Sequence, residues 1–299
     1  MEPKAFDIHS HVNFTAFDAD RDEVIKRAHD AGVWMINVGT EKTTSQGAVE
    51  LSEKFESGVY ATVGFHPIHA GGATYHDTNE LKENEYKKLV EDFSVGGGPH
   101  PEADEPKDQA SGWDKKFYES LARHPKVVAI GECGLDYYRL KEETKERQRK
   151  IFIEQIHLAN EVQKPLMLHV RGERGDDTPY YDALELLEME AKVKVNFHFF
   201  AGSLDVAKKI WERGFTASFT GVITFARAYE KIIKEAPLDM IMTETDCPYA
   251  TPEPYRGRRN EPVYVLEVIK KIARIRGEEY EKVAEQLKEN AIGVFGVAI

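Results

Sequence analysis

The sequence is poor in long apolar runs and in cysteine, and both shortages narrow the cellular setting. No stretch reaches the roughly 20 apolar residues that a membrane-spanning helix needs, and no apolar signal region precedes the first predicted strand. The 299 residues include 2 cysteines, Cys133 and Cys247, a usage typical of a reducing compartment in which thiols stay free. We therefore expect a cytoplasmic protein with no membrane partner, in which both cysteines are structural.

The sequence also lacks an excess of positive charge. Its 40 Lys and Arg residues stand against 52 Asp and Glu residues, for a formal net charge of −12. This balance argues against a general basic surface for gripping nucleic acid. It leaves a nucleic-acid enzyme open, because bound divalent cations and a few arginines can create a local positive pocket on an acidic protein.

Short apolar segments alternate with amphipathic segments along the chain, and hydrophobic residues make up 41% of it. We expect strands at residues 5–11, 34–39, 60–66, 127–132, 166–170, 193–199, 215–220 and 240–246. Helices are predicted at residues 21–31, 43–56, 144–163, 180–191, 203–213, 227–236, 262–276 and 280–290, the fourth of them capped by Thr178. Strand–helix alternation implies parallel pairing with right-handed crossovers. Such units, repeated eight times, predict an α/β fold, a single-domain (β/α)8 TIM barrel over residues 1–299.

One segment breaks this alternation. Residues 70–117, between the third and fourth predicted strands, are rich in Gly, Pro, Asp, Glu and Lys and cannot bury a core. We expect an extended loop insertion on the catalytic face of the barrel, acting either as a lid or as an irregular loop without a catalytic role. The nearby His69, His76 and His100 are expected to be solvated.

Residues able to bind metal ions recur where the predicted strands end. His9 and His11 lie two residues apart on the first strand, so their imidazoles project from the same face. In a barrel the carboxyl ends of all strands meet at one mouth, which brings distant parts of the sequence together. This mouth would be lined by His9, His11, His66, Glu132, His169, His198 and Asp246. Imidazoles and carboxylates in this number predict a site for two divalent metal ions.

Within this set, Glu132 can bridge two ions through its two carboxylate oxygens. His9, His11 and Asp246 would complete the shell of one ion, and His169 and His198 the shell of the other. Glu244 lies two residues before Asp246 on the predicted strand, so its side chain should face inward as well. There it would bind a further ion, position water or form a structural hydrogen bond. The metal stays open, because imidazole ligands suit Zn²⁺, Mn²⁺ or Fe²⁺, whereas phosphoryl chemistry allows Mg²⁺.

Four motifs stand at the ends of predicted strands. They are Asp7-Ile8-His9-Ser10-His11, Gly64-Phe65-His66-Pro67, the run AIGECGLDYY from Ala129 to Tyr138, and ETDCPY from Glu244 to Tyr249 followed by RGRRNEP from Arg256 to Pro262. These motifs resemble the signatures of TatD-type metal-dependent deoxyribonucleases, a family within the amidohydrolase-like barrels. The resemblance covers nearly the whole chain in order, and the departure is the long segment after His66, which bears on substrate access.

The resemblance implies a set of functional residues and a reaction. The metal ligands would be His9, His11, Glu132, His169, His198 and Asp246. The reaction would be hydrolysis of phosphodiester bonds in DNA, in single strands or at ends, as by a 3'-5' exonuclease. His66 would sit beside the metals and contact the substrate phosphate. No obligate protein partner is indicated.

Phosphodiester hydrolysis needs a strong nucleophile and a group that absorbs charge on the leaving oxygen, and two metal ions a few ångströms apart supply both. The expected catalytic residues are Asp246, which takes the proton from water, and Glu132. The expected substrate-binding residues are His66, Glu244, Arg256 and Arg258. Arg256, Arg258 and Arg259 would hold phosphate oxygens by forked hydrogen bonds, Arg256 and Arg258 foremost, or would form a solvated basic turn. Tyr137 and Tyr138 either stack on bases or pack, and Arg171 and Arg174 lie near the mouth with no role assigned.

Two other functions fit the same residues. The first is hydrolysis of an amide, lactone or ester, in a small molecule or an aminoacyl-tRNA, because barrels host many chemistries. Several small-molecule hydrolases of this kind use a carboxylated lysine at the end of the fourth strand, where this chain has Glu132. The second is a metal-bound nucleic-acid binding module, although binding alone does not require two activated metals.

Overall fold

The computed structural model describes residues 2–71, 112–138 and 142–297. Its centre is one sheet of 8 parallel strands in the order β1 to β8. The strands are β1 Ala5–Ser10, β2 Val33–Val38, β3 Val59–Val63, β4 Val127–Asp136, β5 Leu166–Arg171, β6 Val195–Phe197, β7 Thr216–Phe219 and β8 Ile241–Thr243. Two backbone hydrogen bonds join the segment after β8 to β1, from Asp246 N to His9 O (2.8 Å) and from His11 N to Cys247 O (3.0 Å). The sheet therefore closes on itself at the mouth, which confirms the predicted TIM barrel.

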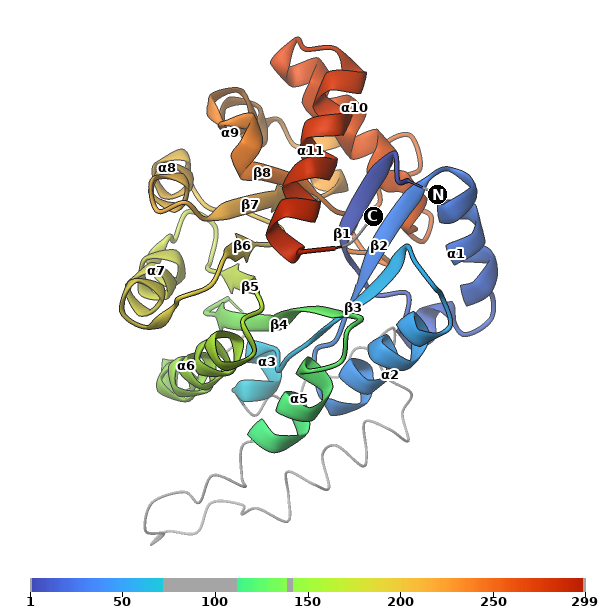
Figure 1. The fold of residues 1–299 in the computed structure, drawn as a ribbon. Coiled ribbons are helices and arrows are strands. Elements are labelled where there is room, and N and C mark those ends of the chain that lie inside the picture. The colour runs from blue at the N-terminus through green and yellow to red at the C-terminus, as the bar shows by residue number, and fades with distance from the viewer. Residues whose placement is uncertain (1, 72–111, 139–141, 298–299) are drawn as a thin grey trace, which may run out of the picture.

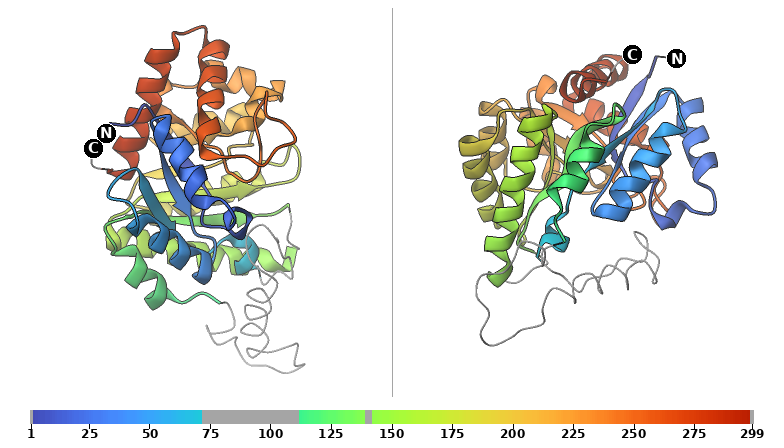
Figure 2. Two further views of the ribbon diagram at one scale, coloured as in Figure 1. Left: turned by 90° about the vertical axis from the view of Figure 1, so that its right-hand side faces the viewer. Right: turned by 60° about the horizontal axis from the view of Figure 1, so that its bottom comes forward.

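Helices surround the strands on the outside (Figure 1). They are α1 Arg21–Asp30, α2 Lys42–Glu53, α3 Pro67–Ala70, α5 Lys115–Ala122, α6 Lys145–Val162, α7 Thr178–Glu190, α8 Leu204–Glu212, α9 Glu230–Glu235, α10 Val265–Arg276 and α11 Tyr280–Phe295, with 3₁₀ turns η1 Thr15–Phe17, η3 Glu142–Thr144, η4 Gly221–Thr224, η5 Arg227–Tyr229, η6 Leu238–Met240 and η7 Pro262–Tyr264. The two ends of the described chain lie close to each other (Figure 2). No helix in the described segments is long and apolar enough to span a bilayer.

Several predicted boundaries were wrong, and three of these errors concern the site. Strand β4 continues to Asp136 instead of ending at residue 132. Strands β6 and β8 end at Phe197 and Thr243, so His198 and Asp246 lie in the loops just beyond them. Asp246 adopts a positive φ of 53°, a turn conformation that periodicity alone does not reveal.

Helix ends also differ from the prediction. Thr178 is the first residue of α7 and Asp177 is its N-cap, so the predicted cap was one residue too late. Helix α11 runs beyond residue 290 to Phe295, where Gly296 at φ 63° ends it. Residues 72–111 of the predicted insertion lie outside the described residues. Of its flanks, Ala70 is the last residue of α3 and Lys115 the first of α5.

Apolar side chains fill both sides of the barrel wall. The larger cluster lies between the strands and the surrounding helices. A second cluster includes Phe6, Ile8, Trp34 and Met167 from the strands together with Phe295 of α11. The register of β1 on β2 shifts between Asp7 and Ser10, and that of β4 on β5 shifts between Ile130 and Cys133. Irregularities of this kind redirect side chains near active sites, and here they flank the candidate ligands.

Candidate metal centre

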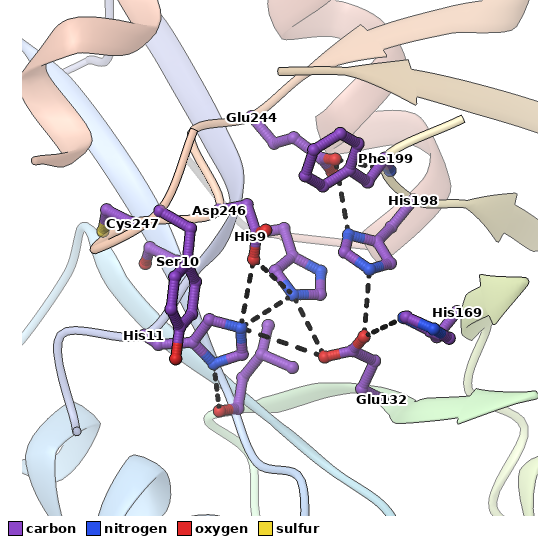
Figure 3. Close-up of polar contacts among 12 residues, drawn as sticks. His9, Ser10, His11, Glu132, His169, His198, Phe199, Glu244, Asp246 and Cys247 are labelled. Carbon is purple, nitrogen blue, oxygen red and sulfur yellow. Dashed lines mark hydrogen bonds and ion pairs between the residues drawn. The ribbon is translucent and has the colours of Figure 1, made fainter. Parts of the chain in front are cut away.

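The structure brings the six predicted metal ligands together at the barrel mouth (Figure 3). They come from β1 or its end (His9, His11), β4 (Glu132), β5 (His169) and the loops after β6 and β8 (His198, Asp246). Their side chains are at most 5% exposed except those of His169 and Asp246, which are 12% and 13% exposed. Burying two carboxylates among imidazoles costs desolvation energy unless partners compensate the charge. Such a cluster is typical of a functional site.

One oxygen of Glu132 faces the histidines of β1. Glu132 Oε2 lies 3.4 Å from His9 Nε2 and 3.9 Å from His11 Nε2. The two Nε2 atoms lie 3.1 Å apart. Asp246 Oδ1 completes this group at 3.8 Å from His9 Nε2 and 3.3 Å from His11 Nε2.

The other oxygen of Glu132 faces a second group of imidazoles. Glu132 Oε1 lies 2.9 Å from His169 Nδ1 and 2.9 Å from His198 Nε2. His66 Nε2 approaches the same oxygen at 3.3 Å. The two oxygens of one carboxylate thus point to two different sets of nitrogen donors.

These spacings fit divalent metal ions. Donor atoms at about 2.0–2.2 Å from one ion lie roughly 2.9–3.6 Å from each other in octahedral or tetrahedral geometry. The separations of 3.1 to 3.9 Å around His9, His11, Glu132 and Asp246 come close to this range. The His9–His11–Asp246 and His66–Glu132–His169 groups each keep their ligand atoms within 4.8 Å of one another. The donor set therefore suits resident metal ions on both sides of Glu132.

The second nitrogen of three imidazoles faces a protein oxygen, through a hydrogen bond in His11 and His169 and at ion-pair distance in His198. His11 Nδ1 lies 3.1 Å from Val38 O and can only donate to this carbonyl, so Nε2 keeps its lone pair. His198 Nδ1 lies 3.3 Å from Glu244 Oε1. Partners of this kind set the tautomer and the basicity of a ligating histidine.

Asp136 plays the same part for His169, although it lies beyond the strand end predicted from the sequence. Asp136 Oδ2 lies 2.9 Å from His169 Nε2, and its other oxygen accepts from Tyr138 N at 3.0 Å. Because an ionised carboxylate only accepts, Nε2 carries a proton and Nδ1 is the nitrogen that faces Glu132. Asp136 is fully buried. The missed signal was the spacing of Glu132, Gly134 and Asp136 on one strand, where Gly134 is needed because a Cβ would collide with His169 O.

Glu244 lies behind His198 and not in the mouth. It is fully buried, accepts from Ser218 Oγ (2.7 Å) and Phe199 N (2.5 Å), and faces His198 Nδ1. Its ligand atoms also come within 4.8 Å of those of His9 and His198. Of the roles expected for Glu244, this position favours the structural hydrogen bond, with the added effect of orienting His198.

His66 and His69 both lie at the mouth. His66 Nδ1 accepts from Ile68 N at 3.1 Å, so in the neutral ring Nε2 carries the proton. Burial, with a further effect of His169, lowers the pKa of His66 to about 4. His69 belongs to α3 and is only 8% exposed, so the prediction of a solvated loop residue was wrong. The helical turn that begins at Pro67 places the imidazole ring of His69 against Phe65.

The carboxylates of the centre stay ionised. Burial raises the pKa of Glu132, but the positive charge of the surrounding His198, His66 and His9 outweighs this effect, and the net pKa is well below its usual value. Burial likewise raises the pKa of Asp246, while its hydrogen bond with His11 brings the net value down. Both groups are therefore available as anionic ligands near neutral pH.

A cavity of about 680 Å³ opens onto the centre. Its lining includes Glu132, Asp246 and the predicted substrate residues His66 and Arg256, and also Arg171. Arg258 is exposed and does not belong to this lining among the described residues. Arg259 instead forms two hydrogen bonds to the Asp20 carboxylate (2.8 and 2.6 Å), which makes it a structural residue.

Tyr137 and the two cysteines have structural roles. Tyr137 is 8% exposed and donates its hydroxyl to Asp182 at 2.8 Å, so it packs and does not stack on a ligand. Cys133 and Cys247 are buried free thiols, and burial raises the pKa of both. Figure 3 shows Cys247 away from the histidines. The expectation of structural cysteines agrees with this placement.

A sequence comparison decides the family. A family model described as TatD related DNase matches residues 6–296. The chain belongs to the TatD-related DNase family. Within it, the chain is 35% identical over 297 residues to an uncharacterized metal-dependent hydrolase, YabD of Bacillus subtilis (strain 168), with 98% of this chain and 99% of YabD covered.

Two other TatD proteins extend the comparison. The 3'-5' ssDNA/RNA exonuclease TatD of Pantoea vagans (strain C9-1) is 30% identical over 301 residues, with 98% of this chain and 100% of the exonuclease covered. The crystal structure of YjjV, a TatD homolog from Escherichia coli K12, matches with a TM-score of 0.75 at 24% identity over 100% of both chains. The present protein is thus a TatD-family metal-dependent hydrolase with the TIM-barrel fold.

Proposed function

We propose that this TatD-family hydrolase cleaves phosphodiester bonds in single-stranded DNA from the 3' end, using two divalent metal ions, Mg²⁺, Mn²⁺ or Zn²⁺. The observation that carries the proposal is the position of Glu132 between two sets of nitrogen donors, 3.4 Å from His9 and 2.9 Å from both His169 and His198. The similarity to the exonuclease TatD of Pantoea vagans supports the substrate.

Metal ions bound on the two sides of Glu132 would supply the Lewis acidity that activates water and neutralises charge on the phosphate. His9, His11 and Asp246 would hold one ion, and His169 and His198 the other, with Glu132 shared. Asp246 lines the cavity, and its carboxylate is positioned to accept the proton that water releases.

Two further groups would bind the phosphodiester. His66 presents its Nε2 proton toward Glu132 Oε1 at 3.3 Å, beside the position where phosphate oxygens would lie. Arg256 lines the same cavity and offers a forked donor to phosphate. Glu244 would act by orienting His198, whereas a phosphate contact from Arg258 stays a prediction.

The experiment that tests this proposal uses purified protein with Mg²⁺, Mn²⁺ or Zn²⁺ and single-stranded DNA labelled at the 5' or 3' end. We expect metal-dependent loss of the 3' label as mononucleotide and complete inhibition by a chelator. No metal-dependent cleavage of DNA would refute the nuclease function. Hydrolysis of a lactone, an amide, a simple ester or an aminoacyl-tRNA in the same assay series, without cleavage of DNA, would favour the competing hydrolase function on the same site.

A further inference from the structure

Two exposed aromatic side chains lie beside arginines of the metal-centre cavity. Phe225 lines this cavity, and Tyr138 lies next to Arg171, which lines it. Tyr138 follows β4 and Phe225 follows η4, and they are 53% and 40% exposed. Arg171 Cζ lies 4.4 Å from the ring centroid of Tyr138, and Arg256 Cζ lies 4.0 Å from that of Phe225. The two pairs come from different strand ends. The first pair, Tyr138 and Arg171, lies at the ends of β4 and β5, and the second, Phe225 and Arg256, lies in the loops after β7 and β8.

The two guanidinium groups are available to a ligand. Neither Arg171 nor Arg256 forms an ion pair with a carboxylate in the part of the chain that the structure describes, and Arg256 donates only to Thr251 O, at 2.9 Å. By contrast, the neighbouring Arg259 is bound by the Asp20 carboxylate. Arg171 and Arg256 both line the cavity that contains Glu132 and Asp246. An unpaired guanidinium in such a position matches the geometry of a phosphate oxygen pair.

Hydrogen bonds hold the backbone beside both rings, while the side chains stay partly exposed. Tyr138 N donates to Asp136 Oδ1 at 3.0 Å, the carboxylate that also holds His169. Tyr137 N, next to it, donates to Arg171 O at 2.8 Å. Phe225 N donates to Val222 O at 3.2 Å. A guanidinium covers one face of each ring, and exposure of the rest leaves room for a flat partner, since bases of any sequence stack on aromatic rings.

We propose that the pairs Arg171–Tyr138 and Arg256–Phe225 are two nucleotide subsites that flank the metal centre. At each, the ring stacks on a base and the guanidinium binds the adjoining phosphate. The inference rests on the proposed function and says how its single-stranded substrate is bound, through the unpaired bases next to the scissile bond. A duplex would be a poor ligand, because its bases are stacked on each other.

The test compares two octanucleotides that differ in bases and not in phosphates. One is octathymidylate, and the other carries an abasic residue at every position. The kcat/KM of each is measured for the wild type, Tyr138→Ala, Phe225→Ala and Tyr181→Ala. Tyr181 is a matched control, because it is 43% exposed and has Lys209 5.2 Å from its ring, but Lys209 does not line the cavity, whereas Arg171 and Arg256 do. Bis(p-nitrophenyl) phosphate reports phosphodiester hydrolysis by the wild type without any base.

We expect the wild type and Tyr181→Ala to prefer the substrate with bases by about 5- to 150-fold for each of the two subsites, the range that stacking of one base gives. Tyr138→Ala and Phe225→Ala should each lose the part of this preference that its own subsite gives, through a higher KM, with circular dichroism spectra equal to those of the wild type. Cleavage of DNA with the full preference kept in both variants would overturn the subsites and leave the nuclease function standing. If the wild type hydrolyses neither the oligonucleotides nor bis(p-nitrophenyl) phosphate, the proposed nuclease function itself is refuted.

Discussion

Replacing Asp136 by Asn tests how the protein prepares its metal ligands. Asp136 accepts from His169 Nε2 at 2.9 Å and from Tyr138 N at 3.0 Å, in a fully buried position. An Asn of the same shape has one acceptor and one donor where Asp136 uses two acceptors. Either orientation of the amide therefore breaks one of the two interactions.

The two orientations have different costs. If the amide oxygen faces His169, the NH₂ group meets Tyr138 N–H and leaves a buried donor unsatisfied, at about 1–3 kcal/mol. If the NH₂ group faces His169, Nε2 must accept and the proton moves to Nδ1, the nitrogen that faces Glu132. Loss of such a partner typically weakens metal binding about 10- to 100-fold, or roughly 1.4–2.7 kcal/mol.

Isothermal titration of the metal-free protein with Mn²⁺ measures this effect directly. We expect the affinity of one ion to fall about 10- to 100-fold in Asp136→Asn. The matched control is Asp182→Asn, which removes the same charge from a carboxylate that accepts from Tyr137 Oη at 2.8 Å and does not contact His169. Unchanged Mn²⁺ affinity in Asp136→Asn, or an equal loss in Asp182→Asn, would refute the proposed role of Asp136.

Three further changes have expected outcomes. Asp246→Asn should abolish turnover of DNA while circular dichroism shows a native fold, and retained turnover would remove Asp246 as proton acceptor. Metal removal should lower the midpoint of thermal unfolding by about 4 °C per site, compared with protein that has metal at 100 times its Kd. This shift follows from roughly 2.7 kcal/mol of binding free energy divided by about 0.6 kcal/mol/K of unfolding entropy for a chain of this length. Equal midpoints in scanning calorimetry would contradict a resident metal. Arg259→Gln should lower the free energy of unfolding in urea by about 1 kcal/mol, because the partly exposed bond to Asp20 is lost. The KM for DNA should stay unchanged, and a raised KM with unchanged stability would show instead that Arg259 binds substrate.

Periodicity in the sequence was enough to predict the barrel and to bring the candidate ligands together. The reason is geometric: parallel strands end at one mouth, so residues at strand ends converge whatever their separation in sequence. His9 and Asp246, at opposite ends of the chain, meet there through the backbone bond from Asp246 N to His9 O. The positions of the ligands depended little on strand boundaries, since a boundary error of two residues leaves a side chain at the same mouth.

What the sequence could not reveal depends on contacts between elements. Asp136 was overlooked because the predicted strand ended at Glu132, whereas pairing with β5 extends β4 by four residues to Asp136. The burial of His69 follows from packing of α3 against the barrel, and no local pattern encodes it. Arg256 and Arg258 lie two residues apart and are both exposed, and of the two only Arg256 lines the described cavity, which their sequence does not distinguish.

The central claim is that Glu132 is shared by two divalent metal ions. Crystals grown with Mn²⁺ and measured for anomalous scattering test it most directly. We expect two peaks in the anomalous difference map, one between Glu132 Oε2 and the pair His9 and His11, the other between Glu132 Oε1 and the pair His169 and His198. A single peak, or peaks that do not contact Glu132, would contradict the account.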